Sequence, residues 1–193
     1  MLQLNPWGSW IEYSSDMDCI TENWQPSDWD CPKASMEVGT PTWAYALDLA
    51  GYSNLPRQFF DLCGKIVHPE GYFLQKYNPD GSVASGWHAS WDPQTKRRLV
   101  PIQEDETALV VWALWHHYNE FRDIEFARQL YRPLITNAAD FMVRFRDEAT
   151  GLPQPSWNLW EDRRAVHTFT MRFPLDPSIL LPRIMSFPPE RLG

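Results

Sequence analysis

The segment Glu104–Tyr118 constrains the fold more than any other part of this sequence. It begins with three acidic residues, 104–106, whose charge favours the N-terminus of a helix, and continues with the unbroken apolar run Ala108–Trp115. A helix with this sequence is apolar on every side, so other elements must cover its whole circumference. We therefore predict a helix over 104–118 that is buried on most of its surface.

Helical patterns also lie on both sides of this segment. We expect one helix over 42–51, with a threonine cap and a glycine stop, and a second over 56–67 that begins with proline. A further helical stretch is expected over 123–145, which Pro133 either ends or kinks. Because helix follows helix and no strand pattern is convincing, the predicted fold class is all-α.

The remaining segments divide the chain into an irregular N-terminal part, a helical domain and a tail. Residues 1–41 show little periodicity, and residues 171–193 hold five prolines, which exclude a long regular helix. Within the domain over 42–170, residues 68–100 are expected to form a long aromatic loop. A loop longer than about 15 residues is either functional or hides a regular element.

The charge balance excludes several classes of partner. Lys and Arg number 17 against 25 Asp and Glu, which gives a net charge of −8 and argues against nucleic acid and anionic membranes. No apolar run approaches the roughly 18 residues needed to span a bilayer. The N-terminus lacks the basic and apolar regions of a signal peptide, so a cytoplasmic location is expected.

The cysteine and histidine positions show no metal signature. Cys19, Cys31 and Cys63 are an odd number at spacings of no metal motif, and free thiols are favoured over a Cys19–Cys31 disulfide. His116 and His117 are adjacent and would point about 100° apart on a helix, so they suit its C-terminal end better than joint metal binding. We expect neither a metal site nor a cofactor.

Two polar clusters, 103–106 and 157–164, could carry chemistry. The second reads Trp-Asn-Leu-Trp-Glu-Asp-Arg-Arg, and carboxylates beside indoles are typical of carbohydrate sites, where rings stack on sugars and acids bind hydroxyls. The indoles would raise the pKa of a neighbouring carboxyl by desolvation, whereas Arg163 and Arg164 would oppose this. The alternative is that the acids only complement the helix dipole and the tryptophans only pack.

Four motifs occur in an order that resembles a known family. Gly71–Gly81, Leu99–Leu109, Gly151–Arg164 and His167–Thr170 together are similar to the bacterial branch of the glucoamylase family, glycoside hydrolase family 15. The resemblance covers 42–170. It implies an (α/α)6 barrel, of which this chain would form an incomplete toroid with long aromatic loops. It also implies inverting exo-hydrolysis of α-glucosidic bonds in an α-glucan or a small α-glucoside.

The resemblance also implies roles for individual residues. Glu161 corresponds to the family's general acid and Trp160 to the tryptophan before it. Asp162 and Asn158 stand where the family has a longer Glu and an Asp, and both would contact substrate. The remaining residues expected along the pocket wall are Trp87, Trp91, Gln103 and Asp105.

The departures from the family pattern leave two hypotheses. The family's general base lies in a C-terminal half of the barrel that is not recognisable here, and residues 28–40 lack the family's clamp for the terminal glucose. The chain is either an exo-α-glucosidase with Glu161 as proton donor, or a truncated, catalytically incompetent fragment that retains part of the carbohydrate-binding surface. An incomplete barrel would expose apolar helix faces, so self-association is expected.

Overall fold

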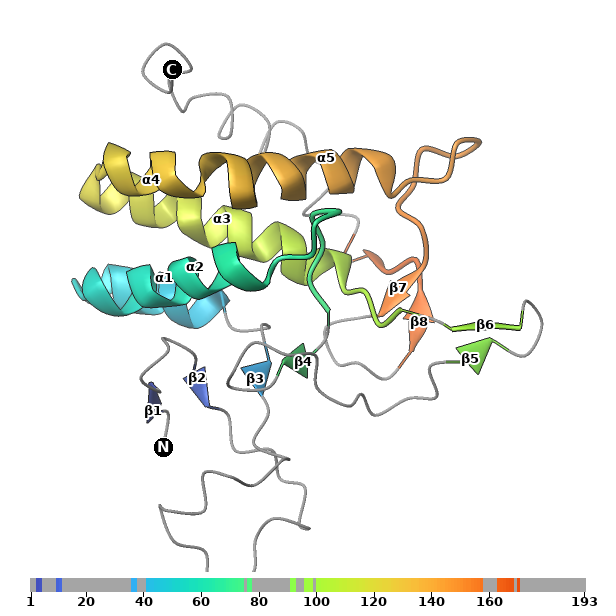
Figure 1. Cartoon of the computed structure of the whole chain (residues 1–193), viewed down its shortest axis with the longest axis horizontal. Coiled ribbons are helices and arrows are strands. Elements are labelled where there is room, and N and C mark those ends of the chain that lie inside the picture. Colours follow the sequence, from blue (N-terminus) through green and yellow to red (C-terminus); the bar gives the residue numbers. More distant parts are fainter. Residues whose placement is uncertain are drawn as a thin grey trace, which may run out of the picture.

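The computed structural model of the chain describes residues 3–4, 10–11, 36–37, 41–74, 76–77, 91–92, 96–98, 100–157, 163–168 and 170. This part is mostly helical, in agreement with the predicted all-α class (Figure 1). Its helices are α1 (Pro41–Leu49), α2 (Asn54–Ile66), α3 (Glu104–Phe121), α4 (Ile124–Leu130), the π-helix η2 (Tyr131–Thr136) and α5 (Asn137–Arg144).

The first helix ends as its sequence predicts and begins differently. Gly51 has a φ of +84°, and its N–H donates to the carbonyl of Asp48 at 2.9 Å, while the N–H of Tyr52 reaches the carbonyl of Leu47. This is a glycine-terminated helix end. At the other end Thr42 lies inside the helix and is not its cap, because Pro41 takes the first helical position, for which its fixed φ is suited.

The central helix is α3, and it is longer than predicted. Its buried residues are Glu104, Asp105, Glu106, Thr107, Ala108, Leu109, Val110, Val111, Ala113, Leu114 and His117, which confirms the predicted burial. The helix ends at Arg122, whose φ is 55° and whose N–H donates to the carbonyl of Tyr118. His116 and His117 therefore lie within the helix, and their interpretation as its C-terminal cap is wrong.

Helices α4 and α5 form one continuous helical path through η2. Asp123 caps its start by accepting a hydrogen bond from the N–H of Phe126 at 3.0 Å. Pro133 does not end the path: the proline has no N–H to donate, and the chain here widens to π-helical turns and continues. In Figure 1 this path runs along one side of α3 and α1 lies on the other, while α2 contacts both α3 and the path.

The first part of the segment predicted as an aromatic loop belongs to the core. Tyr72, Phe73, Leu74 and Tyr77 are all buried, and Leu74 forms a β-bridge with Ile102. Tyr72 and Phe73 have no regular secondary structure, as predicted for a loop, whereas Lys76–Tyr77 form a two-residue strand, and the burial of Tyr72, Phe73, Leu74 and Tyr77 was not predicted. The physical reason is that these side chains pack against the helices, a long-range contact that local polarity does not reveal.

The described strands are two residues long and form antiparallel pairs. β1 (Gln3–Leu4) pairs with β2 (Trp10–Ile11), β3 (Met36–Glu37) with β4 (Lys76–Tyr77), β5 (Trp91–Asp92) with β6 (Arg97–Arg98), and β7 (Ser156–Trp157) with β8 (Arg164–Ala165). Cys63 is a buried free thiol, whereas Cys19 and Cys31 lie outside the described residues. No described helix is both long enough and apolar enough to cross a membrane.

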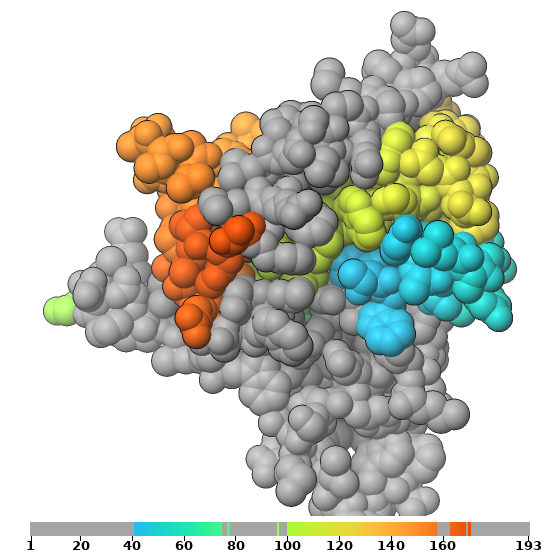
Figure 2. All heavy atoms as spheres, turned by 180° about the vertical axis from the view of Figure 1, so that it is seen from behind, coloured from blue at the N-terminus to red at the C-terminus, as the bar shows by residue number. Residues whose placement is uncertain are grey.

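Helix α1 presents apolar side chains to solvent. Trp43 and Leu49 of α1 are 47% and 66% exposed, and Tyr52, which follows the helix, is 58% exposed; Figure 2 shows α1 and α2 in blue and cyan at the surface. A helix that is apolar on its outer face as well as its inner face is expected where a further element covers it. Self-association through this face remains a prediction.

Candidate active site

The start of α3 is held by main-chain hydrogen bonds to two segments that are distant in sequence. The N–H of Gln103 donates to the carbonyl of Phe73 at 3.4 Å, and the N–H of Trp157 donates to the carbonyl of Ile102 at 3.0 Å. The hydroxyl of Thr107 accepts from the N–H of Phe73 at 3.1 Å. The acidic start of the helix and the segment that ends at Trp157 are thus fixed next to each other.

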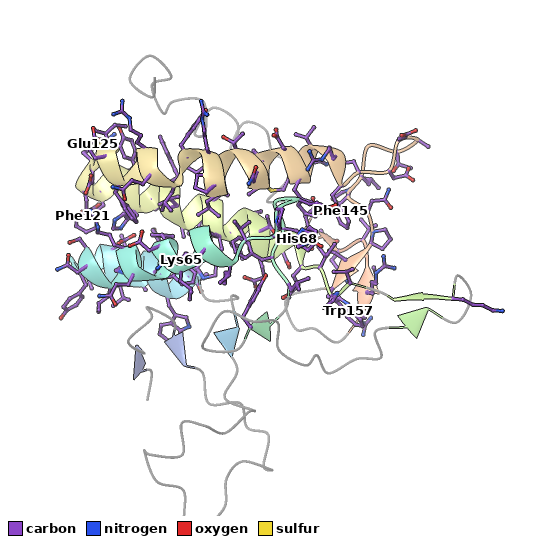
Figure 3. The ribbon with its side chains drawn as sticks, viewed as in Figure 1. Lys65, His68, Phe121, Glu125, Phe145 and Trp157 are labelled. Atoms are coloured by element: carbon purple, nitrogen blue, oxygen red, sulfur yellow. The ribbon has the colours of Figure 1, made fainter. Side chains whose placement is uncertain are left out.

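The strands before and after the motif acid in the sequence pair with each other. Trp157 pairs with Arg164, and Ser156 pairs with Ala165, in the β7–β8 ladder. Figure 3 shows Trp157 at the same end of the helices as His68 and Phe145, and opposite the end marked by Phe121 and Glu125. Strands β7 and β8 therefore lie at the end of the molecule where α3 begins.

The first residues of α3 form a buried acidic cluster. Glu104 and Asp105 are 0% exposed, and Glu106 and the preceding Gln103 are 1% exposed. One oxygen of Asp105 accepts from the N–H of Glu106 at 3.0 Å. Neither carboxyl oxygen of Glu104 is hydrogen-bonded to any residue that the structure describes.

Burial changes the protonation of this cluster. It raises the pKa of Glu104 to about 8, opposed by the positive charge of Arg146 and assisted by the negative charge of Asp105. Burial also raises the pKa of Asp105 to about 6, which the N–H of Glu106, the charge of His167 and the hydroxyl of Thr170 oppose. At neutral pH Glu104 therefore holds its proton, while Asp105 is mostly ionised.

Of the residues that the sequence assigned to the site, the structure brings Gln103 and Asp105 together in this cluster. For Trp91 the structure describes the backbone, which pairs with Arg98 in the β5–β6 ladder. The other assigned residues, Trp87, Asn158, Trp160, Glu161 and Asp162, lie outside the described residues.

Three residues near the cluster were not assigned to the site by the sequence. The charge of Arg146 lowers the pKa of Glu104. Arg146 follows α5, some forty positions after Glu104 in the chain, and no spacing rule predicts that the two lie close together. His167 and Thr170 both lower the pKa of Asp105. Both belong to the motif His167–Thr170, which was the feature of the sequence that could have indicated their place near the site. The tertiary fold therefore places the positive charge of Arg146 and the polar side chains of His167 and Thr170 near acidic residues that are neighbours in sequence.

The described part of the cluster can both donate and accept hydrogen bonds. No group of three or more His, Cys, Asp or Glu side chains among the described residues could hold a metal ion. A protonated carboxyl can both donate and accept a hydrogen bond, and an ionised neighbour accepts only. This pairing of donor and acceptor matches an alcohol.

Comparison with known proteins finds one distant similarity. Over 126 residues the chain is 32% identical to a protein of Methanocaldococcus jannaschii whose name is uncharacterized glycosyl hydrolase. The match covers 65% of this chain and 17% of the relative, so the chain spans about a sixth of that protein's length. No family model matches the chain. No solved structure matches it either.

Proposed function

We propose that this chain forms part of a glycosidase active site that hydrolyses α-glucosidic bonds, with Glu161 as the general acid. The observation that carries the proposal is the main-chain bond between Trp157 and Ile102. It holds the strand that leads into the Trp-Asn-Leu-Trp-Glu motif next to the buried acidic start of α3. The distant relative named glycosyl hydrolase supports the same class of reaction.

The proposed reaction needs a proton donor and a proton acceptor. Glu161 gives its proton to the glycosidic oxygen, which leaves with the aglycone, while a second carboxylate takes a proton from the attacking water. Attack from the opposite face inverts the anomeric carbon, for which the two carboxyls stand about 6.5–9.5 Å apart.

Within the described cluster, Asp105 is better suited than Glu104 to accept a proton. The pKa of Asp105 is about 6 and that of Glu104 about 8, so at neutral pH Asp105 is mainly a carboxylate and Glu104 is mainly protonated. Asp105 is therefore the first described residue to test as the base. If another residue is the general base, the Asp105→Asn variant will still release glucose.

The test is glucose release from maltooligosaccharides by the purified chain and by Glu161→Gln. The amide keeps the size and hydrogen bonding of the acid but has no proton to give, so release should stop while sugar binding persists. Glu125→Gln is the control, because Glu125 lies exposed at the opposite end of the helices. Equal release by the native chain and Glu161→Gln would refute the assignment.

The same experiment separates the second candidate function, a sugar-binding fragment without turnover. That candidate is favoured by the extent of the match, which spans 17% of the relative. It predicts that the native chain and Glu161→Gln bind maltotriose with equal affinity and that neither releases glucose. Absence of both binding and release would exclude both candidates.

A further inference from the structure

Glu104 is enclosed by protein and yet has no described hydrogen-bonding partner. Its side chain is the first of α3 and is 0% exposed, and both carboxyl oxygens lack a hydrogen bond to any described residue. Buried polar atoms in folded proteins are normally satisfied by protein or by ordered solvent. Both oxygens are therefore available to hydrogen-bond a ligand.

The surrounding charges restrict what this ligand can be. Arg146 and Asp105 act directly on Glu104, and further groups lie around the cluster, namely Glu106 on the same helix, Cys63 of α2 and His167 after β8. An anion would be repelled by ionised Asp105. Among the described residues, no group of three or more His, Cys, Asp or Glu side chains could hold a metal ion. A neutral ligand with hydroxyl groups is not repelled by Asp105 and can both accept from and donate to a neutral carboxyl of Glu104.

We propose that Glu104 is a substrate-binding residue that hydrogen-bonds, as a neutral carboxyl, a sugar hydroxyl in the site described above. The inference rests on the proposed function and deepens it. The carbonyl oxygen of Glu104 accepts from the sugar hydroxyl, and its O–H donates to a second oxygen of the sugar. Glu104 thereby acts in binding and not in proton transfer, which separates its role from those of Glu161 and Asp105.

The protonation of Glu104 agrees with this role. Burial raises its pKa to about 8, so the donor is present at neutral pH and is lost as the pH rises further. An ionised Glu104 would keep two acceptors but could no longer donate. Sugar affinity should therefore fall by about tenfold for each pH unit above 8, as expected when only the protonated form of Glu104 binds the sugar.

The experiment measures maltotriose affinity by calorimetry for the full chain and two variants between about pH 6 and 9. Glu104→Gln keeps an acceptor and a donor without titrating, so its affinity should remain and should no longer fall above pH 8. Glu104→Met keeps the approximate size but removes hydrogen bonding, so its affinity should drop at least about tenfold at every pH. Glu125→Gln, on the exposed surface of α4, should behave as the native chain.

The outcomes distinguish this inference from the proposed function. Native affinity that persists in Glu104→Met, or that is flat up to pH 9, would overturn the role of Glu104 and leave the glycosidase proposal standing. No maltotriose binding by the native chain, together with no glucose release, would refute both. Circular dichroism of each variant shows whether the helices are intact, and Glu104→Gln alone decides the pH dependence if Glu104→Met does not fold.

Discussion

Asp48 of α1 and His117 of α3 meet inside the core, where Nδ1 of the imidazole lies 2.8 Å from Oδ1 of the carboxylate. The two side chains are only 2% and 1% exposed. Aromatic rings of Phe60, Phe121 and Phe126 lie within 5.6 Å of the imidazole, measured between ring centroids. This polar contact thus joins two helices in otherwise apolar surroundings.

Removing Asp48 should be strongly destabilising. Asp48→Ala leaves the imidazole of His117 buried without its partner, and breaking a buried pair in this way costs about 3–5 kcal/mol. Urea denaturation measures the loss. Asp61→Ala, at an exposed position of α2, should change the free energy of unfolding by less than about 0.5 kcal/mol. Similar small losses in both variants would contradict a structural role for the pair.

Gly71 should tolerate no larger residue. Its φ is +95°, and a β-carbon there would collide with the backbone carbonyl of Asn137. Gly71→Ala should therefore lower the free energy of unfolding by well over the roughly 1–2 kcal/mol that a left-handed backbone alone costs. Gly151→Ala isolates that backbone cost, because Gly151 has a φ of +70° and open space around it. Thermal unfolding that shifts equally in both variants would exclude the steric contribution.

Stability should fall as the pH rises, because of Glu104. A carboxyl whose pKa is raised by folding, here from 4.5 to about 8, binds its proton more tightly in the folded chain. Its contribution is fully present below about pH 4.5 and disappears as the pH rises to about 8. The change amounts to at most about 5 kcal/mol.

Glu104→Gln removes this titration, so its free energy of unfolding should vary less between about pH 5 and 8 than that of the native chain. Urea denaturation across this range makes the comparison. Asp105 contributes with the same sign below about pH 6 in both proteins. Parallel curves for the native chain and the variant would show that Glu104 is ionised at neutral pH.

Asp123 should contribute mainly as a helix cap. The N–H of Phe126 holds the pKa of Asp123 below its ordinary value, and the neighbouring Arg57 adds to this effect. Asp123→Ala should cost about 1–2 kcal/mol, and stability from this group is lost as the pH falls through its lowered pKa.

Asp123→Asn keeps the cap oxygen and removes the charge. Because the Asp123 and Arg57 side chains are 35% and 36% exposed, this variant should cost less than about 1 kcal/mol in chemical denaturation. A loss in Asp123→Asn as large as that in Asp123→Ala would mean that the ion pair with Arg57 outweighs the cap.

The sequence by itself determined the helical class and the position of the buried helix. The apolar run of Ala108–Trp115 has no polar side to present to water, so any fold must cover it, and Gly51 ends α1 by a local backbone requirement. The acidic residues 104–106 favour a helix N-terminus, and this local preference predicted that Gln103 and Asp105 lie at the start of a helix. These features depend on residues close together in the chain.

Only the tertiary structure decided what these residues touch. The partner of His117 is 69 positions away, the charge that acts on Glu104 comes from Arg146, and Tyr72 and Phe73 are core residues in a segment with the polarity of a loop. Long-range contacts depend on how helices pack, and packing is decided by the shape and volume of many side chains together. The protonation of the acidic cluster follows from that packing, because burial and not sequence position raises its pKa values.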